Sequence, residues 1–120
     1  MRMTENRRRI LAALQNRNFL EYGTPPYNAA TVAAMLDAPN LNNVGRTLRA
    51  LERLGLVVSE ERAVPVWSEI QGGHCDRVQR CYWNAETMRR DKAAADEWIA
   101  GAEDRRDTAL DAMMKKFYGQ

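Results

Sequence analysis

A stretch near the middle of the chain combines a helix signal with a helix stop, and it constrains the fold more than any other. Apolar residues recur there at the spacing of one buried helical face: Leu41, Val44, Leu48, Leu51 and Leu54. Asn40 can cap the first turn of such a helix, and Gly55 can adopt the left-handed conformation that ends it. The pattern predicts an amphipathic helix over residues 40–54, with a strand starting at residue 56.

The opposite face of this helix is polar and basic. It carries Asn42, Arg46, Arg49 and Arg53, which lie in one narrow stripe because successive residues turn by about 100°. Arginine and asparagine side chains make paired hydrogen bonds to guanine and adenine in the DNA major groove. The stripe therefore favours a DNA-reading helix over the other interpretation, an ordinary solvent-facing helix.

The distribution of charge also favours a nucleic-acid partner. Residues 1–62 hold nine arginines against six acidic residues, whereas residues 85–120 hold seven basic and eight acidic residues. Every basic residue before Lys92 is an arginine. The guanidinium group of arginine can form bidentate hydrogen bonds to phosphate and guanine. An ordinary charged surface would give the same counts, so the charge supports the helix argument without replacing it.

Length and composition exclude several classes of protein. The chain has 120 residues, enough for one domain with an appendage. No apolar run approaches the roughly 18–20 residues that a membrane span needs. The first residues do not resemble a signal peptide, and Cys75 and Cys81 are too few for a disulfide framework. We therefore expect a cytoplasmic protein without membrane contacts.

The first residues predict a helix with a basic patch. Thr4 can cap a helix that runs to about Asn16 or Leu20. The three arginines at residues 7–9 cannot all face inward, so they form either a solvent-facing surface or a contact to DNA phosphates.

A second, short helix and a tight turn precede the arginine helix. Residues 22–27 contain two prolines and a glycine, which predict a loop. Asn28 can cap the short helix, and residues 37–40 form the turn that leads into residues 40–54. Helix, tight turn and arginine-faced helix together are the helix-turn-helix pattern.

Two β-rich segments after the arginine helix predict a hairpin. Residues 63–70 pair with residues 78–84, and residues 71–76 form the turn between them. Pro65 indicates an edge strand. Arg77 and Arg80 are placed to reach a phosphate or a minor groove from this hairpin.

The last third of the chain predicts a long helix. Residues 85–118 contain no proline, and apolar residues recur near a spacing of three and four between Met88 and Phe117. Gly101 weakens a single unbroken helix by about 1 kcal/mol relative to alanine. The apolar side needs a partner, and we expect the same helix of a second copy, giving a homodimer through residues 85–118. The alternative is that the segment folds back on its own domain as two helices.

These features resemble winged helix-turn-helix proteins, such as the MarR, PadR and ArsR transcription regulators. The residues that carry the resemblance are Val32 and Ala33 in the short helix, then Val44, Arg46, Leu48 and the run Leu51-Glu52-Arg53-Leu54-Gly55-Leu56-Val57. It covers residues 4–84, and the last helix is similar to the dimerisation helix of PadR-type proteins. It implies a DNA-binding domain over residues 1–84 and a dimerisation helix over residues 85–120. The segment from Leu56 to Trp83 is longer than the wing of those families.

The predicted fold is therefore mainly α with a small β-hairpin (α+β), a winged helix-turn-helix with a long C-terminal helix. We expect a homodimer that binds double-stranded DNA and regulates transcription, reading an inverted repeat with residues 40–54. The predicted DNA-binding residues are Asn42, Asn43, Arg46, Thr47, Arg49, Arg53, Arg77 and Arg80. The alternative is that the same module serves DNA segregation or replication, or docks an acidic protein partner.

Other chemistry has less support in the sequence. His74, Cys75 and Cys81 are three potential metal ligands where a structural zinc needs four, so we predict neither a metal nor a cofactor. The two cysteines could instead sense redox state. A single histidine and the lack of a nucleophile motif or a glycine-rich phosphate loop argue against an enzyme.

Several aromatic residues allow two interpretations. Trp67, Tyr82 and Trp83 either stack on bases or pack into the core. Tyr22 and Tyr27 flank the two prolines and could line a small-molecule effector pocket between the DNA-binding and dimerisation parts, although no further residue supports an effector.

Overall fold

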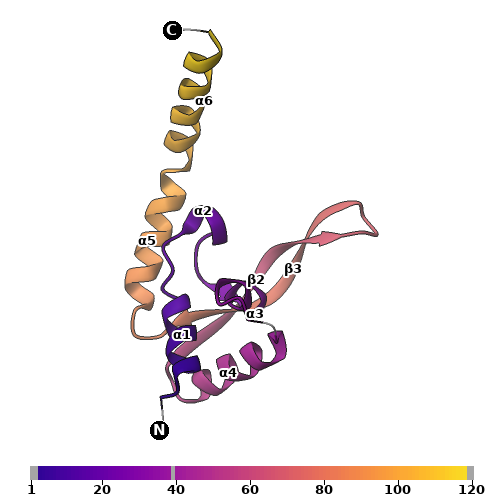
Figure 1. Cartoon of the computed structure of the whole chain (residues 1–120), viewed down its shortest axis with the longest axis vertical. Helices are drawn as coiled ribbons and strands as arrows, with labels where there is room; N and C mark the ends of the chain where they lie inside the picture. Colours follow the sequence, from indigo (N-terminus) through magenta and orange to yellow (C-terminus); the bar gives the residue numbers. More distant parts are fainter. Residues whose placement is uncertain (1–2, 39, 119–120) are drawn as a thin grey trace.

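The computed structural model describes residues 3–38 and 40–118 and shows an α+β protein (Figure 1). Within these residues, the protein has six helices and a three-stranded antiparallel sheet with the strand order β1-β3-β2. The elements are α1 (Glu5–Ala13), α2 (Phe19–Tyr22), β1 (Tyr27–Asn28), α3 (Ala29–Met35), α4 (Leu41–Arg53), β2 (Val57–Ser68), β3 (Gly73–Asn84), α5 (Met88–Ala100) and α6 (Ala102–Tyr118).

Helix α1 is shorter than predicted. Thr4 caps it as expected, because its Oγ1 accepts a backbone hydrogen bond of the first turn at 3.2 Å. The predicted end near Asn16 or Leu20 was wrong, because α1 ends at Ala13 and a separate helix, α2, follows. Asparagines cause the break: Asn16 Oδ1 accepts the backbone N–H of Asn18 at 3.1 Å, and Asn18 caps α2. Such side-chain bonds compete with the helical backbone pattern.

Helices α3 and α4 begin at the predicted caps. Asn28 Oδ1 accepts a first-turn N–H of α3 at 2.8 Å, and Asn40 Oδ1 accepts one of α4 at 3.2 Å. Gly55 has a φ of 78°, the left-handed conformation expected at the end of α4. The predicted turn at residues 37–40 includes Pro39, which lies outside the described residues.

The hairpin of β2 and β3 is longer than predicted. The two strands pair along their whole length, and residues 69–72 connect them. The prediction of strands at 63–70 and 78–84 was too short, and the predicted turn at 71–76 was wrong for residues 73–76, which belong to β3. Charged residues at the start of β2 obscured the strand, because they interrupt the apolar alternation that marks one.

Strand β1 was not expected. Tyr27 pairs with Tyr82, and Asn28 pairs with Cys81. A strand of two residues has no periodicity of its own, and its position depends on β3. Because β3 lies between β1 and β2, β2 is an edge strand, which confirms the edge position predicted for Pro65.

One hydrophobic core joins α1, α3, α4 and the inner half of the sheet. Its fully buried aliphatic side chains are Ile10, Leu14, Val32, Leu48, Leu51 and Val57. Each such side chain contributes roughly 1.5–3 kcal/mol through burial. At the ends of α4, Leu41 and Leu54 are about half exposed, so the apolar face predicted for this helix is buried in its centre alone.

The aromatic residues of the hairpin divide between core and solvent. Tyr82 and Trp83 are buried, as the core interpretation expected, and Trp83 Nε1 donates to Glu60 Oε1 at 2.6 Å. Trp67 is 62% exposed, so the core interpretation was wrong for this residue.

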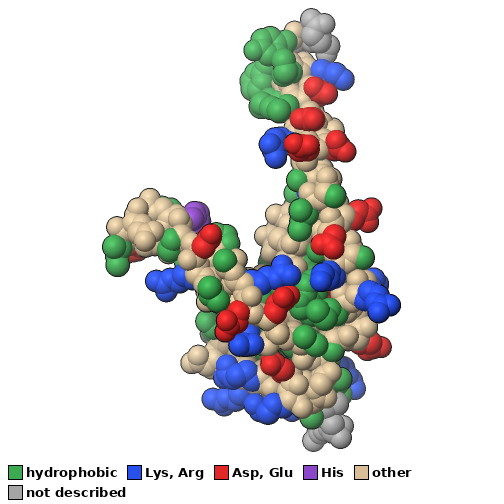
Figure 2. Space-filling view, turned by 180° about the vertical axis from the view of Figure 1, so that it is seen from behind, with side chains coloured by type: hydrophobic (Ala, Val, Ile, Leu, Met, Phe, Trp, Pro, Cys, Tyr) green, Lys and Arg blue, Asp and Glu red, His purple; other side chains and the backbone are tan. Residues whose placement is uncertain are grey.

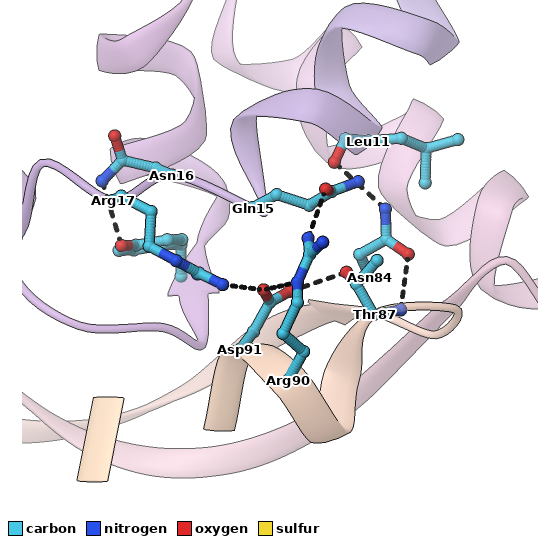
Figure 3. Close-up of polar contacts among 9 residues, drawn as sticks. Leu11, Gln15, Asn16, Arg17, Asn84, Thr87, Arg90 and Asp91 are labelled. Atoms are coloured by element: carbon cyan, nitrogen blue, oxygen red, sulfur yellow. Dashed lines mark hydrogen bonds and ion pairs between the residues drawn. The ribbon is translucent and has the colours of Figure 1, made fainter. Parts of the chain in front are cut away.

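A polar cluster attaches α5 to the first part of the chain (Figure 3). Asp91 is fully buried, and its Oδ1 lies 3.0 Å from Arg17 Nη2 and 3.7 Å from Arg90 Nε. Its Oδ2 accepts the Thr87 hydroxyl at 2.7 Å. Arg90 also donates to Gln15 Oε1 at 2.8 Å. The root of α5 is therefore fixed to the segment between α1 and α2.

Helices α5 and α6 meet at Gly101, and α6 extends away from the body (Figure 1). Arg105 lies over the ring of Trp98, 3.6 Å from its centroid, and a Cβ on Gly101 would come within 2.9 Å of Arg105 Nη1. Because α5 ends at Ala100 and α6 begins at Ala102, the prediction of one long helix was wrong at Gly101. The alternative of two helices that fold back on the domain was right in the division into α5 and α6 and for α5, whose Asp91 and Ala95 are buried, but wrong for α6, in which no residue is buried.

None of the helices in the described part of the chain is long and apolar enough to cross a lipid bilayer.

Candidate nucleic-acid interface

The outer face of α4 carries a row of unpaired polar side chains. Asn42, Arg46, Arg49 and Arg53 are all exposed. With the described residues, the three arginines form no hydrogen bond or ion pair. Figure 2 shows basic side chains gathered at the end of the molecule that holds α4, opposite the free end of α6. The guanidinium groups of this row are therefore available to an outside acceptor.

A groove runs beside this row. It has a volume of about 520 Å³ and lies between α4, the start of α3 and strand β3. Its lining residues include Asn42, Arg46 and Arg49 from α4, and Gln79 and Arg80 from β3. The structure thus brings Arg80 of β3 beside predicted residues of α4 that lie more than 30 positions earlier in the sequence.

One residue of this groove, Gly45, escaped the sequence argument, whereas another, Tyr82, was predicted either to stack on bases or to pack into the core. Gly45 is buried in α4, and a Cβ there would meet Arg49 Nη1 at 3.4 Å, an ordinary van der Waals contact. Tyr82 lines the groove, and its burial, with Glu52 nearby, raises the pKa of its phenol. The phenol therefore stays neutral at neutral pH. A glycine in the middle of a predicted helix was the one sequence signal for this contact.

Asn43 and Thr47 lie beside the row. Thr47 is half-buried, and its hydroxyl donates to the Asn43 carbonyl oxygen at 2.9 Å. The Thr47 oxygen can accept a further hydrogen bond, but its proton already has a partner. Asn43 is exposed, and its side chain stays available.

Arg80 is held in a network at the base of the hairpin. It donates to Ser59 Oγ at 2.9 Å and forms an ion pair with Glu61 at 3.3 Å. Ser59 in turn donates to the carboxylate of Glu52 on α4, at 2.7 and 2.9 Å. Because an exposed ion pair contributes only about 0–1 kcal/mol, a phosphate could replace Glu61 at little cost.

Arg77 and Arg80 lie on opposite faces of β3, because they are three residues apart in a strand. Arg77 is exposed opposite Val64, and it forms no hydrogen bond or ion pair with the described residues. The two arginines therefore cannot contact the same flat surface.

The basic patch of α1 is divided. Arg9 donates to the Leu36 carbonyl oxygen at 3.3 Å, which holds it against the end of α3. Arg8 is exposed, and Arg7 is half-buried. This patch is separate from the groove, since none of its residues lines it.

The potential metal ligands do not converge. Among the described residues, no group of three histidine, cysteine or acidic side chains could hold a metal ion. Cys75 and Cys81 lie six residues apart on β3, about 20 Å, whereas a disulfide needs Cα atoms within about 7 Å. Burial raises the pKa of the Cys81 thiol, which makes it less reactive. His74 packs edge-on against Trp67, with ring centroids 5.4 Å apart.

Tyr22 and Tyr27 do line a cavity, of about 290 Å³. Its other walls come from the segment before α3 and from β2 and β3, and none comes from α5 or α6. The predicted position between the DNA-binding and dimerisation parts was therefore wrong. Tyr27 donates to the Gly23 carbonyl oxygen at 2.8 Å, so its hydroxyl is occupied.

Comparisons of the chain with protein-family models, with curated proteins and with solved structures find no match.

Proposed function

We propose that this protein binds double-stranded DNA sequence-specifically as a homodimer and regulates transcription, with α4 as its recognition helix. The observation that carries the proposal is the row of unpaired arginines on α4. Arg46, Arg49 and Arg53 are exposed and form no hydrogen bond or ion pair with the described residues.

The packing of α4 supports insertion into a major groove. Val44, Leu48 and Leu51 fix the inner side of the helix in the core, so its outer side is presented rigidly. A major groove is about 12 Å wide and accepts an α-helix. Arg46 and Arg49 can each pair with guanine, and Asn42 can pair with adenine.

The order of elements supports a winged helix-turn-helix. Helices α3 and α4 are joined by a short turn, and the β2–β3 hairpin follows α4 directly. In this arrangement the hairpin is the wing, and Arg80 and Arg77 serve as backbone contacts. The groove that joins α4 to β3 would then follow the sugar–phosphate backbone beside the major groove.

The exposed apolar side chains of α6 support the homodimer. Leu110, Met113, Met114 and Phe117 are all about half exposed or more, and they recur at helical spacing. The acidic residues of α6 lie mostly in its first half, whereas Lys115 and Lys116 lie in its last turn. An antiparallel pair of α6 helices would therefore bury the apolar stripes and place opposite charges side by side.

The DNA proposal is tested by selecting bound duplexes from a random library and measuring affinity for the selected site against salt. We expect an inverted repeat with half-sites about 34 Å apart, or a multiple of this. The slope of log affinity against log salt should be steeply negative for the wild type. An Arg46→Ala, Arg49→Ala variant should lose about 1–3 kcal/mol of binding free energy for each guanine contact removed, and should no longer discriminate at the base pairs that these arginines contact. An Arg89→Ala variant, which changes an exposed arginine of α5, is the control. Wild-type affinity and wild-type sequence preference in the double variant would refute the proposal.

The dimer is tested separately by sedimentation. A Met113→Glu, Phe117→Glu variant should sediment as a monomer. It should bind a half-site through the same contacts as the wild type, but bind the full inverted repeat more weakly than the wild type does. A wild-type chain that sediments as a monomer at micromolar concentration would remove the dimer, and with it the inverted repeat.

A further inference from the structure

The outer half of the β2–β3 hairpin stands clear of the body (Figure 1). Strand β1 pairs with β3 at Tyr82 and Cys81 alone, so the hairpin is two-stranded from Arg80 outwards. A two-stranded hairpin is at best marginally stable in water. From Arg80 to the start of β3 at Gly73, it extends about 23 Å at roughly 3.3 Å per residue.

The hairpin tip, which we define as residues 67–74, carries two exposed large apolar side chains among polar residues. Ile70 in the connecting turn is 99% exposed, and Trp67 is 62% exposed beside the ring of His74. Glu69 is the one acidic residue of the tip. The outer end of the hairpin thus presents a large aliphatic side chain that no other residue covers.

The base of the hairpin forms one wall of the groove between α4 and β3. Gln79 and Arg80 line this groove together with Arg46 and Arg49, so the hairpin leaves the body from the wall where DNA is proposed to lie. Further out, Arg77 is exposed and unpaired among the described residues. Residues 63–79 of the hairpin carry Arg77 against Glu69 and Asp76, so their charge is slightly negative. The place of the hairpin base in the groove beside Arg46 and Arg49 is therefore what favours DNA as the partner of the tip.

We propose that the hairpin tip bends DNA, with Ile70 inserted as a wedge between base pairs of the minor groove. This inference rests on the proposed binding of α4 in the major groove. The adjacent minor groove lies half a helical turn away, about 17 Å for a turn of roughly 34 Å, and the 23 Å reach of the hairpin exceeds that distance. Apolar side chains that enter a minor groove unstack a base step and kink the duplex by about 20–90°.

The test measures the shape of the duplex independently of affinity. The probe is the selected duplex with a donor and an acceptor dye at its ends and 2-aminopurine at successive steps outside the α4 contacts. With wild-type protein we expect a bend of about 20–90° and increased 2-aminopurine emission at one step. Ile70→Ala should lose most of both signals, while its affinity falls by less than about tenfold because the α4 contacts remain. Leu20→Ala changes another exposed aliphatic residue, 85% exposed on α2, and should leave both signals unchanged.

Glu69→Gln gives an independent measurement. If the tip lies among phosphates, removal of this carboxylate should tighten DNA binding, whereas a tip that lies away from DNA predicts no change.

The possible failures are distinguishable. A straight duplex with wild-type protein, or a bend that survives both Ile70→Ala and Ile70→Asp, would overturn the wedge and leave α4 binding intact. A sedimentation change in Ile70→Asp without any change in the bend would show that the tip contacts protein, which also overturns the wedge. Failure of the proposed function appears elsewhere, as wild-type binding by the Arg46→Ala, Arg49→Ala variant.

Discussion

Loss of the Arg17 guanidinium should loosen the attachment of α5, because it leaves a buried carboxylate poorly compensated. Asp91 is fully buried, and the closest cation to its Oδ1 is Arg17 Nη2 at 3.0 Å. Arg90 lies further away, at 3.7 Å. Arg17→Met keeps most of the side-chain volume and removes the charge, so Oδ1 would keep Arg90 as its remaining partner in the described structure.

The magnitude follows from the burial of the pair. Breaking a fully buried ion pair costs about 3–5 kcal/mol. The Arg17 side chain is 41% exposed, so solvent screens the interaction, and we expect a loss of about 1–3 kcal/mol in the free energy of unfolding. For a chain of this length, that loss lowers Tm by roughly 5–15 °C.

The assay is thermal and urea unfolding of four proteins in a double-mutant cycle: wild type, Arg17→Met, Asp91→Asn and the double variant. Because Asp91→Asn removes the buried charge, Arg17→Met should cost less in that background than in the wild type. Arg89→Met changes an exposed arginine of α5, the helix that holds Asp91. We expect its free energy of unfolding to stay within about 0.5 kcal/mol of the wild-type value. A loss below about 0.5 kcal/mol for Arg17→Met, or the same loss in both backgrounds, would refute the reasoning.

Three further predictions concern single contacts. Gly45→Ala should raise the free energy of unfolding by up to about 1 kcal/mol and leave DNA affinity nearly unchanged, since its Cβ would meet Arg49 Nη1 at 3.4 Å, an ordinary contact; a loss of affinity of about tenfold or more in the selected-site assay would contradict this. Gly55→Ala should destabilise the protein by roughly 1–2 kcal/mol in urea unfolding, because its φ of 78° is left-handed. Trp83→Phe should lower Tm at pH 7 by more than at pH 3. The hydrogen bond from the Trp83 indole lowers the pKa of Glu60 in the folded protein. The stability from this bond is therefore present above the pKa that Glu60 has in the unfolded chain, and it is lost as pH falls through the lower pKa of Glu60 in the folded protein. An equal loss of Tm at both pH values would show that the hydrogen bond to Glu60 contributes nothing.

The sequence predicted the starts and ends of helices that depend on residues a few positions away. The caps at Thr4, Asn28 and Asn40 and the stop at Gly55 are where they were expected, because each residue satisfies or ends a helix with atoms a few positions away. The arginine row of α4 followed from helical periodicity in the same way.

Features that depend on distant residues were not predictable. Strand β1 exists through pairing with Tyr82 and Cys81, more than 50 positions further along the chain. Asp91 belongs to a charged stretch that resembles a solvent-facing helix, and no local signal indicates its pairing with Arg17. The ion pair of Arg80 with Glu61 required the register of β2 against β3, which the sequence left open.

The junction at Gly101 has a consequence for the spacer between half-sites. Beyond it, α6 has 17 residues and is about 25 Å long. In a dimer joined through α6, a rotation of about 10° at this junction moves the far end of each lever by about 4 Å, slightly more than the 3.4 Å rise of one base pair. Arg105 on Trp98 bridges the junction and resists larger rotations. Such a dimer would tolerate spacers that differ by one base pair and discriminate against those that differ by several.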